Sequence, residues 1–170
     1  MITACTIILL FTVVLLHGHT DTGSMIPTIV PGNGHLSYRF AYISEPVERY
    51  DVVVFKSQEP GDNSLLVKRV IGLPGDTVFL NADDQRVYIN GDPVSEPYLN
   101  EPPYNYDDQT YTVPEGHYFM MGDNRNHSSD SRVWGYLDKE DIIGRVFLRY
   151  NLWGENGFYF KGVPRGAVRN

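Results

Sequence analysis

The chain has 170 residues, which is enough for one domain with its own core but too short for two full domains. Charged residues make up 21% of the chain and hydrophobic residues 42%, a composition that excludes global disorder. The formal net charge of −7 excludes a protein that binds nucleic acid by electrostatic attraction to phosphates. The single cysteine, Cys5, cannot form an internal disulfide, and no cysteine cluster offers a metal site.

The first twenty residues contain no Asp, Glu, Lys or Arg, and their densest apolar run is Ile7–Leu16. A membrane-spanning helix needs about 20 mainly apolar residues. Residues 1–20 therefore predict a short apolar helix that anchors the chain in a membrane. Two other interpretations stay open, namely a secretory signal peptide that lacks the usual basic start and a buried core segment. No Lys or Arg precedes the run, so charge does not set its orientation.

Residues 21–170 alternate short apolar runs with turn signals, which is typical of a mainly antiparallel β domain. Sixteen Gly, eleven Pro and twelve Tyr favour strands and turns over a helical bundle. The predicted strands cover residues 51–56, 65–73, 77–80, 87–90, 110–113, 118–121 and 142–150. Asn90-Gly91 predicts a type I′ hairpin, residues 96–108 a loop, and residues 138–141 one helical turn.

Three polar segments carry the residues that could do chemistry. They are Asp21–Thr28 (DTGSMIPT), Val67–Asp76 (VKRVIGLPGD) and Gly122–Arg132 (GDNRNHSSDSR). Taken singly, each also has an ordinary structural interpretation: a turn, a strand with a solvent-facing lysine, and a polar loop. Their combination carries more weight than any one of them.

Lys68 has the strongest physical argument among these residues. If its segment is a strand, side chains alternate, and Lys68 shares one face with Leu66 and Val70. Arg69 then points to the other face. Burial among apolar neighbours lowers the pKa of a lysine, and a neutral amine can accept a proton from a serine hydroxyl. Of the four lysines in the chain, Lys56 is the main competing candidate because it ends a predicted strand.

Together and in this order, the three segments resemble the type I signal peptidase (leader peptidase) family of Ser-Lys membrane serine proteases. Ser-Met-x-Pro-Thr is matched at residues 24–28, Lys-Arg-x-x-Gly-x-Pro-Gly-Asp at residues 68–76, and Gly-Asp-Asn-Arg-x-x-Ser-x-Asp-Ser-Arg at residues 122–132. The resemblance covers about residues 22–146. It implies a mainly β fold whose antiparallel sheets form a barrel-like arrangement behind the short apolar helix.

The resemblance also implies roles for individual residues. Ser24 is the expected nucleophile and Lys68 the expected general base. The Thr22 hydroxyl and the Ser24 N–H are expected to stabilise the oxyanion of the tetrahedral intermediate. Ser128 is expected to orient the lysine. No metal or cofactor is expected to take part.

In the same family an aspartate and an arginine brace the third motif, and here Asp130 and Arg132 would form that ion pair. The implied function is removal of N-terminal signal peptides from secretory preproteins after Ala-x-Ala-like sites. The implied location is the plasma or inner membrane, with a single-pass anchor in residues 1–20 and an extracytoplasmic catalytic domain in residues 21–170. The expected partners are preproteins and the lipid bilayer, and not nucleic acid.

Four features depart from the family pattern. Thr22 stands where serine is frequent, which keeps the hydroxyl but adds a β-branch. His127 stands where asparagine is common, and Asn33 where aspartate is usual. The lead-in to the nucleophile, Leu16–Asp21 (LHGHTD), is short and polar where the family has an extended apolar strand. Either residues 12–16 serve as that strand or upstream sequence has been lost, and the missing basic flank favours the second.

Other functions and sites stay open beside this one. A self-cleaving repressor-type protease would also use a Ser-Lys pair, and a secreted β-rich binding module would use none of these residues chemically. A Ser-His-Asp triad with His117 or His127 would be recognised by geometry, although the Gly-x-Ser-x-Gly elbow is missing. His17 and His19 have metal-like spacing but no third ligand in the sequence nearby.

Overall fold

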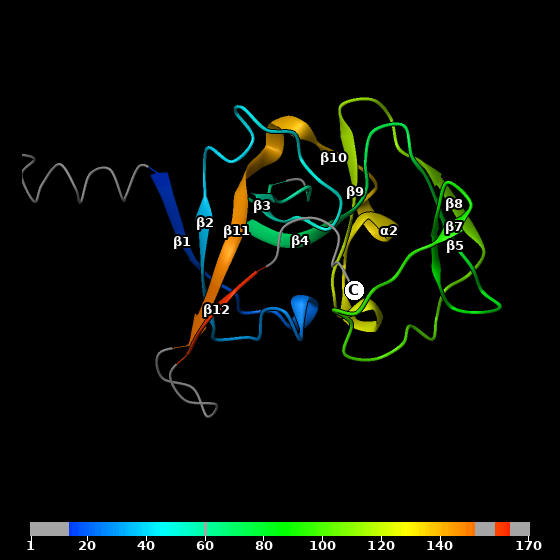
Figure 1. Ribbon diagram of the computed structural model, residues 1–170, viewed down its shortest axis with the longest axis horizontal. Coiled ribbons are helices and arrows are strands. Elements are labelled where there is room, and N and C mark those ends of the chain that lie inside the picture. Colours follow the sequence, from blue (N-terminus) through cyan, green and yellow to red (C-terminus); the bar gives the residue numbers. More distant parts are fainter. Residues whose placement is uncertain (1–13, 60, 152–158, 164–170) are drawn as a thin grey trace, which may run out of the picture.

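The computed structural model describes residues 14–59, 61–151 and 159–163, and they form two antiparallel sheets that lie side by side (Figure 1). The first sheet has the strand order β1-β2-β11-β3-β4-β9-β10, and β12 pairs with β11. Its strands are β1 (Leu15–His19), β2 (Gly34–Tyr38), β3 (Val52–Lys56), β4 (Leu65–Gly72), β9 (His117–Met121), β10 (Leu137–Asp138), β11 (Ile142–Asn151) and β12 (Tyr159–Gly162).

The second sheet is smaller and has the order β7-β6-β5-β8. Its strands are β5 (Thr77–Leu80), β6 (Val87–Ile89), β7 (Asp92–Pro93) and β8 (Gln109–Thr112). Short helices lie in the connections: η1 (Gly23–Met25), η2 (Arg125–His127), α2 (Ser131–Trp134) and η3 (Lys139–Asp141). The prediction of a mainly antiparallel β chain is therefore confirmed.

All seven strands predicted from apolar runs are present, and each of their ends agrees with the prediction or differs from it by one residue. The Asn90-Gly91 turn is also present: both residues have positive φ, 54° and 92°, as a type I′ turn requires, and Ile89 pairs with Asp92 across it. The predicted helical turn at residues 138–141 is found as η3, and residues 96–108 contain no strand. The short or polar strands β2, β7, β10 and β12 were not predicted, and β1 overlaps the strand that was considered as an alternative at residues 12–16.

The barrel-like closure implied by the family resemblance is not found among the described strands. The first sheet is open, because its hydrogen-bonded path begins at β1 and ends at β10 rather than returning to its start. The prediction of antiparallel sheets thus holds, and the prediction of a barrel does not. The two sheets are joined by packing instead.

The start of the chain leads into the first sheet. Residues 1–13, which hold most of the predicted apolar helix, lie outside the described residues. Leu15–His19, the end of the predicted anchor, form the strand β1, which pairs with β2 from Leu15 opposite Tyr38 to His19 opposite Gly34. This strand precedes η1 (Gly23–Met25), the turn that contains Ser24. Within the described ranges there is no helix both long enough and apolar enough to cross a membrane.

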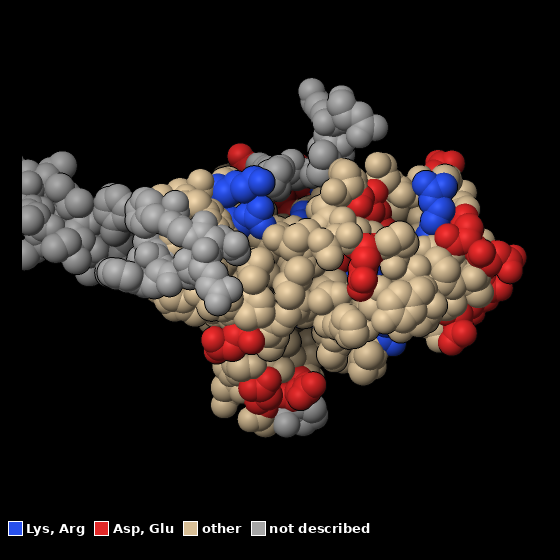
Figure 2. Space-filling view, turned by 90° about the horizontal axis from the view of Figure 1, so that it is seen from below, with Lys and Arg blue, Asp and Glu red and all other residues tan. Residues whose placement is uncertain are grey.

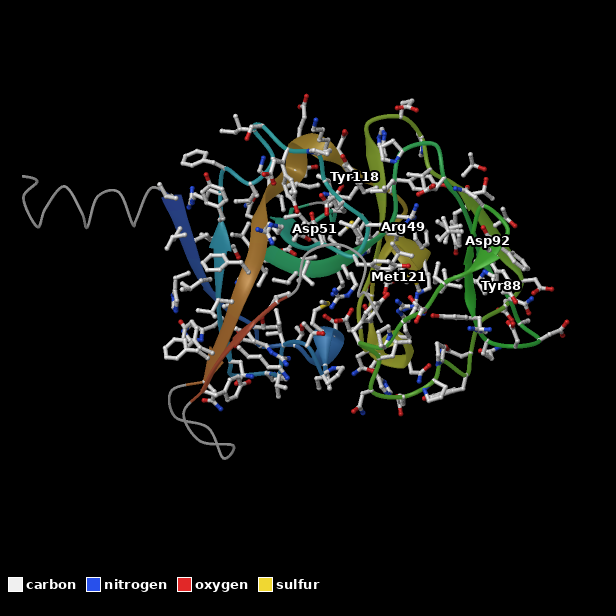
Figure 3. All side chains as sticks on the ribbon, viewed as in Figure 1. Arg49, Asp51, Tyr88, Asp92, Tyr118 and Met121 are labelled. Carbon is white, nitrogen blue, oxygen red and sulfur yellow. The ribbon has the colours of Figure 1, made fainter. Side chains whose placement is uncertain are left out.

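The core lies on both faces of the central strands. On β3, Val52 and Val54 pack in one apolar cluster, whereas Val53 and Phe55 pack in another. This is why an unbroken apolar run forms a strand here, since both of its faces are buried. A third cluster joins the sheets, and Figure 3 shows Met121 at that junction, where it packs with buried side chains of the second sheet.

Candidate active site

Ser24 lies in η1, the turn that connects β1 to β2, and its side chain is buried. Lys68 lies on β4, directly opposite Val53 of β3. Its Nζ donates a hydrogen bond to Ser24 Oγ over 2.6 Å. Lys68 shares its face with Leu66 and Val70, both of which belong to the same apolar cluster as Val53, so the predicted alternation along this strand is found.

The surroundings of Lys68 favour its neutral form. The residue is only 4% exposed, and this burial lowers the pKa of its amine below the ordinary value of 10.5. The carboxylates of Asp130 and Asp123 act in the opposite direction, but burial is the larger effect. The amine is thus a better proton acceptor near neutral pH than an exposed lysine.

Thr22 lies two residues before Ser24 and is exposed beside the dyad. Its Oγ1 is 3.4 Å from Ser24 Oγ, so both hydroxyls face the same space. The third motif reaches this place from another part of the chain. Asn124 donates its backbone N–H to the Ser24 carbonyl over 3.0 Å and its side-chain Nδ2 to the Gly23 carbonyl over 3.0 Å.

Ser128 is brought to the site, but without the predicted hydrogen bond to Lys68. Its Oγ is buried and has no hydrogen-bond partner within the described part of the chain. It packs against Gly122, where an added Cβ would lie 2.3 Å from Ser128 Oγ and 2.5 Å from the Ser24 carbonyl oxygen. Ser128, Gly122 and Ser24 therefore meet in a space too small for any side chain at position 122.

Asp130 and Arg132 form the ion pair that the resemblance implies. The Arg132 guanidinium donates to both carboxylate oxygens, with Nε–Oδ1 at 2.7 Å and Nη2–Oδ2 at 2.8 Å. Asp130 Oδ2 also accepts the Gly122 N–H over 3.0 Å, and Arg132 Nη2 donates to the Arg125 carbonyl over 2.8 Å. The pair thus fixes the backbone of the third motif at two points.

Two further buried ion pairs support the same loop, and sequence reasoning did not assign them. Arg69 donates to both carboxylate oxygens of Asp123, over 2.7 and 2.6 Å. Arg125, whose side chain is fully buried, donates to both oxygens of Glu96, over 2.8 and 2.6 Å. The first pair joins the second and third motifs, and the opposite charges of Arg69 and Asp123 are the sequence signal that could have indicated it. The second links the motif to a loop 29 positions away in sequence, and no local pattern indicated it.

The dyad opens into a pocket of about 240 Å³. The residues that line it come from the turn that holds Ser24, the β3–β4 loop, β4, the third motif and α2: Thr22, Gly23, Ser24, Ser57, Gln58, Glu59, Asp62, Leu66, Lys68, His127, Ser129 and Trp134. None of them belongs to the second sheet. Figure 2 shows that Asp and Glu side chains gather at the end of the molecule formed by that sheet and also on a lobe at the lower edge of the view.

The competing candidates lie elsewhere or lack partners. The Lys56 side chain is 61% exposed and its Nζ lies 3.7 Å from Asp141 Oδ1, so it is not part of the dyad. His117 lies near Asp138 on the β9–β10 edge. His127 lines the pocket, but the hydrogen-bond partner of Ser24 Oγ at 2.6 Å is Lys68. Among the described residues no three His, Cys, Asp or Glu side chains, including His17 and His19, are grouped to hold a metal ion.

Comparison with known proteins shows the family to which the chain belongs. The family model described as "Signal peptidase, peptidase S26" matches residues 1–153. A signal peptidase I from Leptolyngbya laminosa is 40% identical over 143 residues, covering 79% of this chain and 69% of the relative. A probable signal peptidase I-1 from Synechocystis is 37% identical over 161 residues, covering 89% and 80%.

Structural comparison agrees with the sequence comparison. The crystal structure of a signal peptidase I from Enterococcus faecalis V583 aligns with a TM-score of 0.51 and 36% identity, covering 59% of this chain and 97% of that one. The protein therefore has the fold and the sequence of a serine endopeptidase. Specifically, it belongs to the signal peptidase family, peptidase S26.

Proposed function

We propose that this protein removes N-terminal signal peptides from secretory preproteins, with Ser24 as the nucleophile and Lys68 as the general base. The observation that carries the assignment of roles is the 2.6 Å hydrogen bond between Lys68 Nζ and Ser24 Oγ in a buried setting. Membership of the signal peptidase family supports the substrate class. The alternatives, a self-cleaving repressor and a binding module, have no such support.

The reaction proceeds in two steps through a covalent intermediate. Neutral Lys68 takes the Ser24 proton while Oγ bonds to the carbonyl carbon before the scissile bond. The tetrahedral intermediate then collapses, the C–N bond breaks, and the Lys68 ammonium gives its proton to the departing amine. In the second step Lys68 takes a proton from water, which attacks the acyl carbon, and the proton returns to Ser24 as the ester bond breaks.

The Ser24 N–H and the Thr22 hydroxyl serve as oxyanion donors in this proposal. Thr22 supports that role because its hydroxyl lies 3.4 Å from Ser24 Oγ, close to where the intermediate forms. One such donor typically contributes about 2.7–4 kcal/mol to the transition state. Ser128, with its buried and unpaired hydroxyl, is the proposed partner that orients the Lys68 amine during the reaction. Asp130 and Arg132 hold the loop that carries it.

The same proposal places the protein at a membrane. The apolar residues 1–20 are the proposed single-pass anchor, although Leu15–His19 at its end form a strand, and residues 21–170 are the proposed extracytoplasmic domain. The proposed recognition of Ala-x-Ala-like sites fits a small pocket whose apolar walls include Leu66 and Trp134. Large side chains before the scissile bond should therefore be poorly accepted.

The deciding experiment is processing of a model preprotein by the full chain reconstituted in lipid vesicles. Ser24→Ala and Lys68→Ala should lose processing, whereas Lys56→Ala should keep the wild-type rate because its side chain is 61% exposed and is not among the residues that line the pocket. Replacing the alanine before the cleavage site by tryptophan should block cleavage. Substantial processing by Lys68→Ala, or a loss confined to Lys56→Ala, would contradict the assignment of the base.

A further inference from the structure

The orientation of the peptide group between Gly23 and Ser24 determines where one proposed oxyanion donor points. Its N–H belongs to Ser24 and is one of the two proposed oxyanion donors, while its C=O belongs to Gly23. A trans peptide group is planar, so its N–H and C=O point in opposite directions and can only turn together. Whatever holds the Gly23 carbonyl also determines where the Ser24 N–H points.

Asn124 holds that carbonyl from the third motif. Its Nδ2 donates to Gly23 O over 3.0 Å, and its backbone N–H donates to the next carbonyl, that of Ser24, over 3.0 Å. The Gly23 carbonyl also accepts the Ile26 N–H within the turn, over 3.2 Å. Asn124 therefore supplies the restraint that reaches this peptide from outside its own turn, from a residue 101 positions away.

We propose that Asn124 is a positioning residue that orients the oxyanion donor of Ser24, an inference that rests on the function proposed above. A glycine precedes the peptide, and without a Cβ its backbone restricts the peptide plane less than any other residue does. Oxyanion donors act over a narrow range of about 2.7–3.1 Å, so a small rotation of the plane weakens the interaction. A hydrogen bond accepted by the C=O also polarises the N–H of the same group.

The Asn124 amide donates to a backbone carbonyl and not to the base. Its effect should therefore be separable from that of Lys68: the rate of the chemical step should fall, while the pH at which the base loses its proton should stay the same. Substrate binding in the ground state should also be nearly unchanged, because an oxyanion exists only in the transition state and intermediate.

The test is Asn124→Ala in the full chain, assayed with a peptide substrate over a range of pH. We expect kcat to fall about tenfold, KM to stay within about twofold and the acid limb of the profile to stay in place. Asn126→Ala is the matched control. It removes the same side chain two residues away, where the amide bonds to Glu101 and to the Pro102 carbonyl, and it should keep wild-type kcat.

Asn124→Asp is the second variant, because it keeps the shape of the side chain and the backbone hydrogen bond if Asn124→Ala does not fold. Its carboxylate cannot donate to the Gly23 carbonyl, so kcat should fall at least as far. Combining Asn124→Ala with Thr22→Val should give a loss that is not the product of the two single losses, because both act on one oxyanion.

Any of these results would overturn the inference: unchanged kcat in both Asn124 variants, an effect on KM alone, a displaced acid limb in Asn124→Ala, or an equal loss in Asn126→Ala. A product of single losses in the double variant would likewise count against it. Failure of the proposed function is recognised separately, because then the wild-type protein would not cleave the substrate or Ser24→Ala would still cleave it.

Discussion

Lys68 and Ser24 are 44 positions apart in sequence, yet the amine nitrogen of the first lies 2.6 Å from the hydroxyl oxygen of the second. The contact exists because β4 lies within the first sheet and the turn η1 folds against it. The lysine is fixed by its strand and the serine by its helical turn. Both groups are therefore held on regular elements, which keeps the distance between them well defined.

The pH dependence of cleavage should report the protonation of Lys68. Burial lowers the pKa of this amine below 10.5, and only the neutral amine can accept the Ser24 proton. We therefore expect kcat/KM to rise with pH through a midpoint below the ordinary lysine value and to be lost on the acid side. A rate that does not fall toward acid pH, or a midpoint at the ordinary lysine value, would contradict an amine base with a lowered pKa.

Removing the buried amine should stabilise the protein, and the gain should depend on pH. Because the folded-state pKa of Lys68 is lowered, the unfolded chain binds one more proton between that pKa and about 10.5, so wild-type stability rises with pH there. Lys68→Met has no such group. Its advantage in free energy of unfolding should be largest at acid pH and shrink toward pH 10.5, by about 1.4 kcal/mol per unit of pKa shift.

This stability prediction is measured by denaturant unfolding of both proteins at several pH values. Lys56→Met is the control, since the Lys56 amine is largely exposed and its removal should change stability by no more than about 0.5 kcal/mol at any of them. A Lys68→Met advantage that grows with pH would reverse the predicted sign.

Gly122 should tolerate no side chain. An added Cβ would lie 2.5 Å from the Ser24 carbonyl oxygen, which is backbone and cannot move without displacing the nucleophile turn. Gly122→Ala should therefore lower both activity and the free energy of unfolding, the latter by about 1–3 kcal/mol. Gly162→Ala is the matched control, because the nearest atom to its Cβ would be the Phe147 carbonyl oxygen at 3.9 Å. Equal behaviour of the two variants would refute the steric explanation.

The buried pair of Arg125 and Glu96 should be costly to break. Glu96→Gln leaves the fully buried guanidinium without its counter-charge, and such a change typically costs about 3–5 kcal/mol. Asp141→Asn removes the partner of the exposed Lys56 instead and should cost less than about 1 kcal/mol. Thermal or denaturant unfolding compares the two. Similar losses would mean that Arg125 finds another partner.

The sequence predicted those parts of the fold that depend on local pattern. Continuous apolar runs such as that of β3 indicate strands, and a turn such as Asn90-Gly91 is defined by two adjacent residues. The strand β1 was considered only as an alternative, at residues 12–16, because its leucines continue an apolar run typical of a membrane helix, and only its pairing with β2 makes it a strand. The openness of the first sheet likewise depends on long-range pairing.

The contrast between local pattern and long-range contacts also explains which parts of the site could be predicted. The alternation around Lys68 and the motif matches were enough to predict the dyad as a pair, whereas the place of Ser128 could not be obtained that way. Its hydroxyl packs against Gly122 instead of bonding to the lysine, a detail that depends on how three separate segments meet. Asn124 lay inside a recognised motif, but its hydrogen bond to Gly23 depends on the folded turn.

The second sheet contributes no side chain to the pocket, and its outer hairpin ends at an exposed turn, with Tyr88 and Asp92 nearby (Figure 3). Apart from the two chain neighbours of Gly91, no described residue has an atom within 4 Å of where a Cβ on Gly91 would be. A fluorophore or an affinity tag introduced directly after Gly91 would thus project into solvent. The enzyme could be immobilised or tracked through this hairpin while the pocket stays accessible to substrate.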